Sequence, residues 1–516
     1  MVTYYEADVL IIGSGGAGLR AAIEAEARGA NVLIVSKAAT GMKNATIVAN
    51  GSFRAAVDGY TVEEHRQVTM EGGKHLNDPA LVDVLVSEGA EQLLELRKYG
   101  VAITTRYGNV LCGDNPEARG LGFIQPMVKY LKERGVQLVD KCTITELIKE
   151  NNRVIGAVGL SDEPVVFKAG ATILAAGGSA GVYSRTDCPV DIAGDGYALA
   201  YMAGATLRDM EYIQFTPVAV AEKGYPGFAM YGNIVDKGTL RNSLGEDIVE
   251  KHGITQRLLT TMARDHLSRA IMTEVQEGRG VDGAVLLDAS DVINEVGLEK
   301  LIARSAQRKA LLDLGADEKP FKVAPSCHFT MAGVEIRPDC STNVPGLYAT
   351  GEVTGGVHGA NRLGGNALTE IVVFGARAGA SAAEYAAKHP RQEINYEFKG
   401  AYTTETDPAE TMKELRGLMW DKVGIVRSKE SLSSALDRLS EISKLRFNES
   451  DINQQKQAAE TQMAILASTL TTLSALRREE SRGTHYRVDF PEMKPEWLKP
   501  IRVYKTPNGP SLEGTV

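Results

Sequence analysis

The chain has 516 residues, with 57 Lys and Arg against 66 Asp and Glu, which leaves a net charge of -9. This length exceeds one ordinary hydrophobic core and predicts about three folding units. The mildly acidic balance disfavours nucleic acid or an anionic membrane as the main partner. Glycine supplies 53 residues, more than the usual share of about 7%, so unusual backbone positions are expected.

No apolar run approaches the roughly 18 residues of a transmembrane helix, and no basic segment precedes an N-terminal apolar run as in a secretion signal. We therefore expect a cytoplasmic protein that does not itself span a membrane, with membrane association left open through partner subunits. The cysteines are scattered and contain no CxxC pair, so we expect neither a metal nor an iron–sulfur site in the chain itself. They are Cys112, Cys142, Cys188, Cys327 and Cys340.

A strand, a glycine-rich turn, a helix and a second strand are predicted in succession near the N-terminus. The apolar run 7–12 leads into GSGGAG at 13–18, a helix-forming segment follows, and 31–36 forms the second strand. The glycine spacing lets the chain turn tightly, approach a pyrophosphate and pack the helix on the strand. The pattern predicts dinucleotide binding. The glycines with this spacing are Gly13, Gly15 and Gly18.

The acid that usually binds a ribose at the end of the second strand is absent. Ser36 and Lys37 occupy that place, which weakens a nicotinamide assignment without establishing FAD. The segment 137–176 predicts further strands, the last of which ends at a glycine pair and reaches the cofactor. Asp195 lies in the first turn of the next helix, where it either caps that helix or contacts a ribityl hydroxyl.

The glycine-dense stretch 351–379 combines residues able to hold an anion with glycines that allow close backbone approach. Those polar residues are His358, Asn361 and Arg362, and a long apolar and small-residue run follows them. The stretch is either a turn before a core helix or a loop that holds a bulky anionic cofactor. The upstream glycine motif favours the cofactor loop.

The composition changes along the chain in a way that predicts its organisation. Clustered aromatic residues, glycines and prolines precede amphipathic helices from about 213 to 325, and helical patterns with heavy charge pairing run from about 391 to 480. We therefore predict an α/β fold with an interrupted nucleotide-binding domain, an inserted domain, and a C-terminal helical domain with an extended tail. The predicted boundaries are 1–216, 217–325, 326–392 and 393–516.

Several motifs spread over nearly the whole chain resemble one family. They are GSGGAG at 13–18, LAAGG at 174–178, GDG at 194–196, MEYIQF at 210–215, ARDHLSRAI at 263–271, HFTMAGV at 328–334, GLYATGE at 346–352, HGANRLGGNAL at 358–368 and SRGTHYRVDFPE at 481–492. This set resembles the flavoprotein subunits of succinate dehydrogenase and fumarate reductase, with L-aspartate oxidase and adenylylsulfate reductase α as relatives. The resemblance implies FAD in a Rossmann-like domain and an α+β capping domain inserted into it.

The resemblance also implies roles for individual residues. Arg362 and His328 would bind a substrate carboxylate, Arg264 would donate or accept a proton, and Glu352 would hold the adenosine ribose. His358 would either hydrogen-bond on the flavin side or make a loop contact. Ala367 and Leu368 would meet the isoalloxazine. The other implied cofactor contacts are Gly13, Gly15, Gly16, Ala17, Gly18, Ser36, Lys37, Asn44, Thr46, Ala49, Asn50, Gly51, Ala176, Gly177, Asp195 and Asn366.

The chain departs from the family pattern at positions that matter chemically. Ala45 stands where the family has the histidine that carries covalent flavin, so FAD should be bound non-covalently. Thr216 stands where succinate and fumarate enzymes have a substrate histidine. Met230, Tyr231 and Ile234 fall in the segment that supplies a substrate threonine and an acid–arginine proton relay. These departures leave ordinary interconversion of fumarate and succinate in doubt.

Three hypotheses follow for the function. The leading hypothesis is hydride transfer between flavin N5 and a carboxylate-bearing substrate, with an iron–sulfur subunit or ferredoxin-like carrier as electron partner. A related reaction on a substrate that is not a C4-dicarboxylate, similar to adenylylsulfate reductase or an amino-acid oxidase, is the second. An electron-transfer flavoprotein subunit without substrate turnover is the third.

Overall fold

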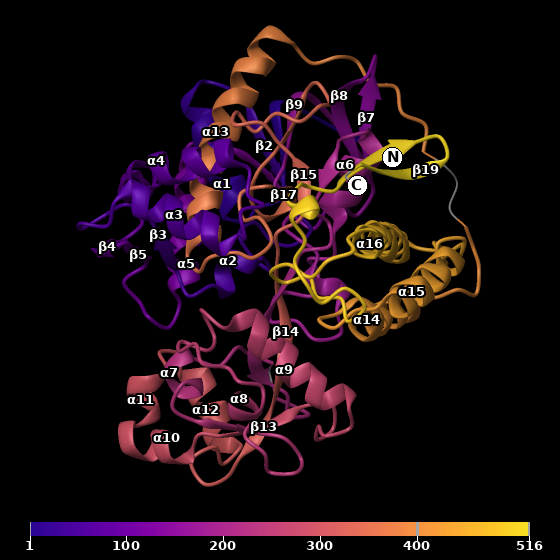
Figure 1. The fold of residues 1–516 in the computed structure, drawn as a ribbon. Helices are drawn as coiled ribbons and strands as arrows, with labels where there is room; N and C mark the ends of the chain where they lie inside the picture. The colour runs from indigo at the N-terminus through magenta and orange to yellow at the C-terminus, as the bar shows by residue number, and fades with distance from the viewer. Residues whose placement is uncertain (1, 226, 399–401, 514–516) are drawn as a thin grey trace.

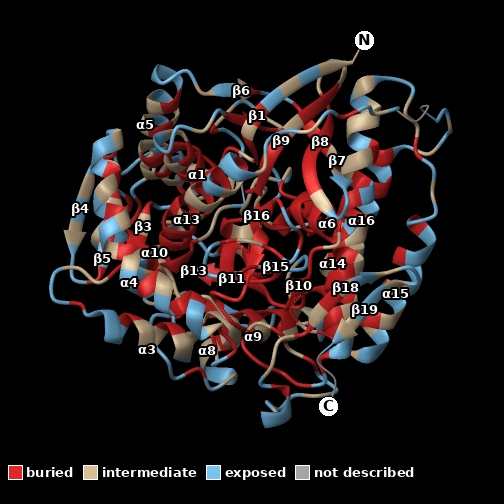
Figure 2. Ribbon diagram, turned by 90° about the horizontal axis from the view of Figure 1, so that it is seen from above, coloured by how far each residue is buried: buried red, intermediate tan, exposed pale blue. Residues whose placement is uncertain are grey.

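The computed structural model describes residues 2–225, 227–398 and 402–513, and it has a large body with a smaller lobe below it (Figure 1). A seven-stranded sheet lies at the centre of the body, and its strands β8 and β9 and the second half of β1 are almost entirely buried (Figure 2). Its strands are β6 (Gln137–Val139), β2 (Val32–Val35), β1 (Thr3–Ile12), β9 (Pro164–Leu174), β8 (Arg153–Leu160), β7 (Thr143–Glu150) and β16 (Leu347–Ala349).

The central sheet is parallel through β6, β2, β1 and β9 and antiparallel through β9, β8 and β7. Strand β9 pairs with β8 along its first half and with β16 along its second half. The predicted strand 7–12 is longer than its apolar run, because Thr3–Glu6 also pair with Val165–Lys168. The carboxyl ends of β1, β2, β9 and β16 therefore meet at one edge, which is where ligands bind in such sheets.

The helices α1 (Gly16–Ala27) and α13 (Asn366–Lys388) pack against each other at very close range. A Cβ atom added at Gly379 would lie 2.2 Å from the Ala21 carbonyl oxygen, and one at Gly375 would lie 2.9 Å from the Ala17 oxygen. Small residues on α13 therefore let it approach the backbone of α1. This contact joins two segments of the cofactor-binding body that are far apart in the chain.

We expect Gly379→Ala to lower the free energy of unfolding by about 1–3 kcal/mol, because the added methyl group must displace backbone of α1. Gly417→Ala is the matched control, since nothing lies within 4 Å of a Cβ there and the site is inside helix α14. That control should raise the free energy of unfolding by about 0.5–1 kcal/mol. Urea unfolding of both variants measures the difference, and equal effects would contradict the packing argument.

The smaller lobe is built on a four-stranded antiparallel sheet in the order β11 (Ile213–Val220), β14 (Phe321–Thr330), β13 (Val285–Asp288) and β12 (Thr239–Arg241). A hydrophobic core formed by residues between Val218 and Val323 fills it. Strands β11 and β14 continue from this lobe into the body. Its helices are α7 (Gly232–Val235), α8 (Ile248–Lys251), α9 (Arg264–Gln276), α10 (Ser290–Val296), α11 (Leu298–Leu301) and α12 (Ser305–Asp313).

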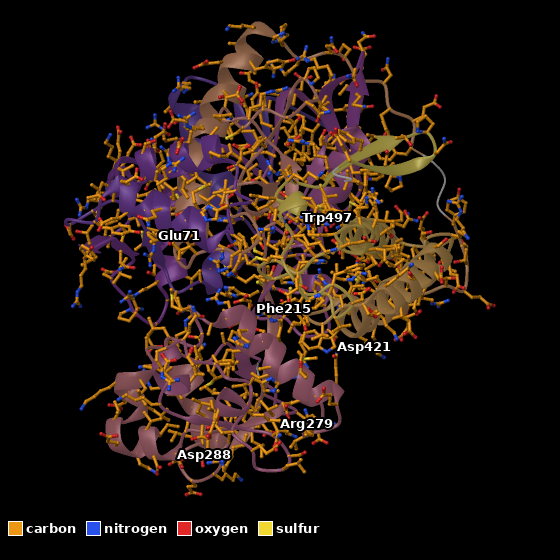
Figure 3. The ribbon with its side chains drawn as sticks, in the orientation of Figure 1. Glu71, Phe215, Arg279, Asp288, Asp421 and Trp497 are labelled. Atoms are coloured by element: carbon orange, nitrogen blue, oxygen red, sulfur yellow. The ribbon has the colours of Figure 1, made fainter. Side chains whose placement is uncertain are left out.

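The C-terminal helices α14 (Pro408–Val423), α15 (Lys429–Ile442) and α16 (Ile452–Arg477) pack beside the body (Figure 1). Their shared core reaches Phe215, which lies where the body, the lobe and these helices meet (Figure 3). The proline-bearing tail was predicted to be extended. It forms η4 (Pro495–Trp497) and a hairpin of β18 (Arg502–Thr506) and β19 (Gly509–Glu513) that pairs with β10 (Leu207–Arg208).

Shorter elements complete the body around the central sheet. The helices are α2 (Ala45–Val48), α3 (Val62–Gly72), α4 (Pro79–Glu95), η1 (Leu96–Tyr99), α5 (Arg119–Glu133), η2 (Ala180–Val182), α6 (Asp195–Ala203) and η3 (Gly351–Val353). The strands are β3 (Ser52–Arg54), β4 (Ile103–Arg106), β5 (Asn109–Cys112), β15 (Gly333–Glu335) and β17 (Thr354–Gly355). The α/β fold with a Rossmann-like body and a C-terminal helical region confirms the predicted fold class.

Polar contacts hold the smaller lobe against the body. The Arg304 guanidinium donates to the carbonyl oxygens of Val48 and Ala49 at 2.7 and 3.0 Å. Ser305 begins α12, and its amide and hydroxyl both donate to Glu117 of the body. A carboxylate from one part thus satisfies the N-terminus of a helix in the other. In the described part of the chain, no helix is both long and apolar enough to cross a membrane.

Candidate active site

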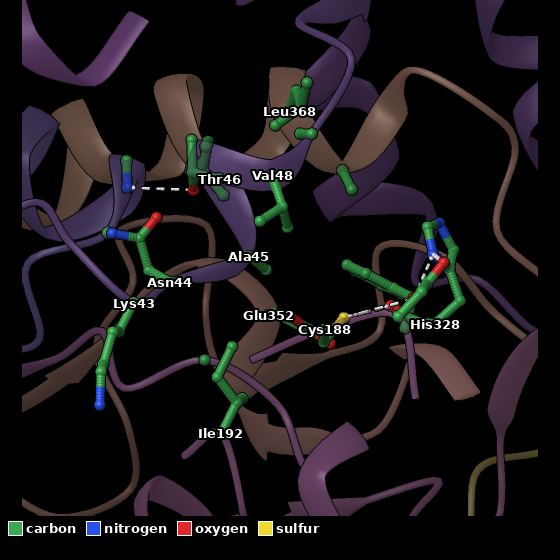
Figure 4. A pocket seen from close by; sticks show the side chains of 18 of the residues that line it. Lys43, Asn44, Ala45, Thr46, Val48, Cys188, Ile192, His328, Glu352 and Leu368 are labelled. Atoms are coloured by element: carbon green, nitrogen blue, oxygen red, sulfur yellow. Dashed lines mark hydrogen bonds and ion pairs between the residues drawn. The ribbon is translucent and has the colours of Figure 1, made fainter. Parts of the chain in front are cut away.

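A cavity of about 640 Å³ runs from the carboxyl edge of the central sheet to the junction with the smaller lobe. Lys43, Asn44 and Thr46 lie on one side of it, and His328 and Cys188 lie on the other (Figure 4). Both the predicted cofactor motifs and the predicted substrate residues line this cavity. The two sets lie toward different ends of it, so the two ends are described separately.

The glycine turn after β1 brings backbone to one end of the cavity. Gly13 has a φ of 114°, and a Cβ there would lie 2.2 Å from the Ala175 carbonyl oxygen. Gly18 faces the turn itself, since its Cβ would lie 2.0 Å from the Gly13 oxygen. A Cβ at Gly15 would meet nothing closer than 3.8 Å and would enter the cavity. Gly13 and Gly18 thus close the turn, and Gly15 leaves room for a ligand at the helix N-terminus.

Lys37 and Asp195 form an ion pair in the wall of the cavity, with the Nζ and Oδ2 atoms 2.5 Å apart. Burial opposes the charge of Lys37, but Asp195, Glu460 and Asp191 together raise its pKa. Asp195 is the first residue of α6, in the first turn that follows the N-cap Gly194. The Asp195 Oδ1 atom is buried and has no partner among the described residues. This acceptor is available to a hydroxyl group of a ligand.

The N-terminus of α13 faces the same cavity. Ala367 and Leu368 line it, and as early helix positions their amides have no acceptor within the helix. The Asn366 side chain points elsewhere, because it bonds to His65 at 2.8 Å and donates to Thr69 at 2.9 Å. A 23-residue helix thus directs free amides and the positive end of its dipole at the ligand.

Glu352 is a buried acid beside the glycine loop that follows β9. Its Oε1 atom accepts from the Thr330 amide at 3.0 Å, and a Cβ at Gly178 would lie only 2.3 Å from that oxygen. Burial raises the pKa of Glu352 to about 7, although the Thr330 amide and Arg362 act in the opposite direction. The carboxyl group therefore holds a proton at pH values where an exposed glutamate is ionised.

We expect this shift to make the flavin-free protein less stable as the pH rises from about 5 to 8. The folded carboxyl has a pKa of about 7 against 4.5 for an unperturbed glutamate, so the folded protein binds more protons in this window. Stability therefore falls as pH rises through it, by up to about 3 kcal/mol for this group. Glu352→Gln should remove that part of the decrease in urea unfolding, and identical pH slopes for the two proteins would rule it out.

At the other end of the cavity, two arginines converge on one amide oxygen. The Gln214 Oε1 atom accepts from Arg264 Nη1 at 2.8 Å and from Arg362 Nε at 3.1 Å. Gln214 is buried on β11 and is held in place by Asn361, which accepts from its Nε2 at 2.8 Å. The Arg362 guanidinium also lies 4.5 Å from the centre of the Phe329 ring.

The two guanidinium groups raise each other's electrostatic energy, and neither has a carboxylate hydrogen-bonded to it among the described residues. Burial and the neighbouring Arg264 lower the pKa of Arg362 to about 10. Burial also lowers the pKa of Arg264, while Asp187 and Asp265 oppose this shift. An anion bound between these cations would relieve the repulsion, so this end of the cavity favours a negatively charged ligand.

His328 completes this end of the site from strand β14. Its Nδ1 atom lies 2.9 and 3.1 Å from the two carboxylate oxygens of Asp187. The Arg264 Nε donates to the Thr260 carbonyl oxygen at 2.9 Å, which fixes the guanidinium at the start of α9. These residues come from the body and from the smaller lobe, so this end of the cavity forms only where the two meet.

The residues that depart from the family pattern have distinct positions. Ala45 and Thr216 line the cavity. Tyr231 also lines it, and its hydroxyl donates to Gln307 at 3.1 Å. Ile234 is fully buried in the hydrophobic core of the smaller lobe, and Met230 is 5% exposed beside it. Neither a carboxylate nor an arginine therefore stands at the three predicted relay positions.

Most predicted site residues line this one cavity, and four lie behind its wall. Gly18 packs against Gly13, Gly51 packs against Arg119, Asn366 bonds to His65, and His358 Nε2 lies 2.8 Å from Glu370. The predicted residues that line it are Gly13, Gly15, Gly16, Ala17, Ser36, Lys37, Asn44, Thr46, Ala49, Asn50, Ala176, Gly177, Asp195, Arg264, His328, Glu352, Arg362, Ala367 and Leu368.

Two residues of the site carried no role in the sequence analysis. Gln214 belongs to the MEYIQF motif, so the motif marked the segment without marking this amide as the bridge between two cations. Asp187 lies between the LAAGG and GDG motifs. Its contact with His328 comes from folding, and the only signal in the sequence is that it is an acid in a polar segment. Both become functional candidates through contacts with residues far away in the chain.

Comparison with known proteins gives the same picture over the whole chain. A family model described as FAD binding domain matches residues 8–368, and one described as fumarate reductase flavoprotein C-term matches residues 412–513. The chain is 40% identical to a fumarate reductase (CoM/CoB) subunit of Methanothermobacter marburgensis, with 96% of this chain and 97% of the relative covered. It is 31% identical to L-aspartate oxidase of Pseudomonas aeruginosa, with 96% and 98% covered.

A comparison with solved structures finds proteins of the same kind. Escherichia coli quinol fumarate reductase matches with a TM-score of 0.88 and 26% identity, covering 99% of this chain and 96% of that chain. The fold is that of FAD-dependent oxidoreductases, and the chain is one of them. The chain belongs to the succinate dehydrogenase and fumarate reductase flavoprotein family. Its own residues fit the cofactor, since the glycine turn, the orphaned Asp195 oxygen and the α13 amides all face the cavity.

Proposed function

We propose that the protein transfers a hydride between flavin and an unsaturated or saturated acid, with a substrate carboxylate held between Arg264 and Arg362. The convergence of both guanidinium groups on the Gln214 oxygen supports this most directly, because it leaves two cations that line a cavity with no carboxylate hydrogen-bonded to either among the described residues. The relative from Methanothermobacter marburgensis is named a fumarate reductase, which supports a carboxylic acid substrate.

Each residue at the substrate end contributes to orientation or charge. Arg362 is held over the Phe329 ring and by Gln214, so its remaining donors are fixed for a carboxylate. Arg264 is fixed from the smaller lobe by the Thr260 carbonyl, which places a second cation on the opposite element. When bound, FAD supplies hydride exchange at its N5 atom. The two cations polarise the carbon–carbon double bond of the acid and stabilise the negative charge that develops next to its carboxylate during hydride transfer.

Fumarate should reoxidise the dithionite-reduced, FAD-loaded protein in anaerobic stopped-flow measurements, whereas its uncharged dimethyl ester should not. Arg362→Gln should slow this reoxidation about 10²-fold or more, because a fixed charged donor is lost. Arg438→Gln is the matched control, since that arginine pairs with Glu414 on the C-terminal helices away from the cavity. Failure of fumarate and of every other small acid tested would refute the proposal and favour an electron-transfer role without turnover.

A substrate other than a C4-dicarboxylate is a second candidate. The observation that favours it is that the neutral side chains of Thr216 and Tyr231 line the cavity, and that the Tyr231 hydroxyl is already bonded to Gln307. The 31% identical L-aspartate oxidase fits the same alternative. A crotonate-type monoacid that reoxidises the reduced protein faster than fumarate would favour this candidate.

We also propose a separate iron–sulfur protein as the electron partner. Within the described residues, no group of three or more His, Cys, Asp or Glu side chains is arranged to hold a metal ion, so this part of the chain offers no set of cluster ligands. Purification from its native cells should therefore bring down a protein that contains iron and acid-labile sulfide.

Acid precipitation of the holoenzyme should release unmodified flavin into solution, because Ala45 has no nucleophilic atom that could form a covalent bond to it. The yellow colour is expected in the supernatant, with the mass of FAD. A pellet that keeps covalently attached flavin would show that another side chain carries it.

A further inference from the structure

The motif SRGTHYRVDFPE at 481–492 has no part yet in the proposed function. It follows α16 and begins with a tight turn, in which the Arg482 amide donates to the His485 carbonyl at 2.9 Å and the His485 amide donates to the Arg482 carbonyl at 3.1 Å. Gly483 and Thr484 are the two central residues of this turn. Both lie against a loop of the body that is far away in the chain.

Buried polar contacts fix the turn to the C-terminal helices. The His485 Nδ1 atom lies 2.8 Å from the Nη1 atom of Arg427, which stands between α14 and α15, and both side chains are buried. The Arg487 guanidinium is also buried and donates to the carbonyl oxygens of Ala475 and Leu476 near the end of α16, each at 3.1 Å. The turn is therefore a rigid support for whatever it contacts.

Ala360, in the glycine-rich loop before α13, is the residue that the turn contacts. Thr484 donates to the Ala360 carbonyl oxygen twice, from its amide at 3.0 Å and from its hydroxyl at 3.3 Å. The Ala360 amide donates to the Gly73 carbonyl at 2.9 Å. Gly483 has a φ of 56°, and a Cβ there would lie 2.3 Å from the Ala360 oxygen. Ala360 is thus held at its amide and at its carbonyl, two residues before Arg362.

The same segment contacts α9, the helix that begins with Arg264. The Arg269 guanidinium lies 5.1 Å from the centre of the Tyr486 ring, which permits a cation–π interaction. A small cavity of about 10 Å³ is lined by Arg264 from α9 and by Gly483 and Thr484 from the turn. That volume is about enough for one water molecule. A C-terminal segment therefore lies against both elements that carry the arginines of the site.

The separation of the two arginines decides whether one carboxylate can bind to both. They meet at the Gln214 Oε1 atom, where Arg264 comes from the smaller lobe and Arg362 comes from the body. Charge-assisted hydrogen bonds weaken steeply when the donor moves out of line, so a shift of either guanidinium group weakens binding of an anion. Contacts that bridge the lobe and the body therefore act on this geometry.

We propose that the segment 482–486 positions the two arginines for the substrate carboxylate. Its turn holds the loop of Arg362 through Ala360. Its Tyr486 ring holds α9 through Arg269. None of the residues of this segment lines the larger cavity, so they are positioning residues that act through the elements they contact. This inference rests on the proposed function, because it concerns the same bound carboxylate.

Gly483→Ala tests the support of the Arg362 loop in the FAD-loaded protein. The added methyl group must displace the Ala360 carbonyl, so fumarate should reoxidise the reduced protein about 10²-fold more slowly. Malonate carries hydrogen on only one carbon and cannot be dehydrogenated to an alkene, so it reports binding alone. Its dissociation constant, followed by the flavin difference spectrum, should rise about tenfold. The flavin content should match that of the wild-type protein.

Gly253→Ala is the matched control. That glycine has a φ of 61°, close to the 56° of Gly483, and nothing lies within 4 Å of a Cβ there. Both variants place an alanine in the left-handed region, and only one of them displaces the loop. The control should be reoxidised at the wild-type rate. Equal slowing in both variants, or a Gly483→Ala protein that loses flavin in proportion to its rate, would show a structural role and overturn the inference.

A second pair of variants tests the contact with α9 without straining the backbone. Tyr486→Leu removes the ring beside Arg269 and should raise the dissociation constant of malonate about two- to fivefold. Tyr486→Phe keeps the ring and should bind malonate as the wild-type protein does. An equal change in both variants, or no change in either, would overturn the part assigned to Tyr486.

The wild-type protein separates this inference from the proposed function. If fumarate reoxidises it and malonate binds, but Gly483→Ala changes neither measurement, the inference fails and the proposed function stands. If the wild-type protein neither binds malonate nor is reoxidised by any small acid, both fail.

Discussion

The end of the cavity that is proposed to bind substrate depends on two arginines that share one amide oxygen. Gln214 accepts from Arg264 and Arg362 together, so the guanidinium groups are held close without a carboxylate between them. Their repulsion and partial burial make the unliganded arrangement costly, which is reflected in the lowered pKa of Arg362. A bound anion relieves this cost. The same contact joins α9 of the smaller lobe to the body, so binding and the meeting of the two parts are linked.

The two strands that connect the parts also carry residues of the proposed substrate end. Gln214 and Thr216 lie on β11, His328 lies on β14, and these strands pair with each other. Their pairing brings the substrate end to the edge of the central sheet, where the glycine turn and the α13 amides form the cofactor end. Arg304 of the smaller lobe donates hydrogen bonds to the carbonyl oxygens of Val48 and Ala49 at the end of α2. One cavity can therefore hold a dinucleotide and an acid in contact.

Local sequence patterns were sufficient for much of the fold. The glycine turn between β1 and α1 follows from spacing alone, since tight turns and close helix packing restrict side chains there. The long helices after residue 408 follow from charge and apolar periodicity. The tail was harder, because the β18–β19 hairpin forms by pairing with β10, a strand far away in the chain. Pairing partners of short strands are a property of the tertiary structure.

The sequence by itself determined the class of protein, the cations available for a substrate, and the loss of the family's ionisable groups at Thr216 and Ile234. These are matters of residue identity at recognisable motifs. Only the tertiary structure decided that Gln214 bridges two arginines, that Asp187 lies within hydrogen-bond distance of His328, and that burial raises the pKa of Glu352 to about 7. Hydrogen-bond partners and burial come from segments that meet only after folding, and no local pattern records them.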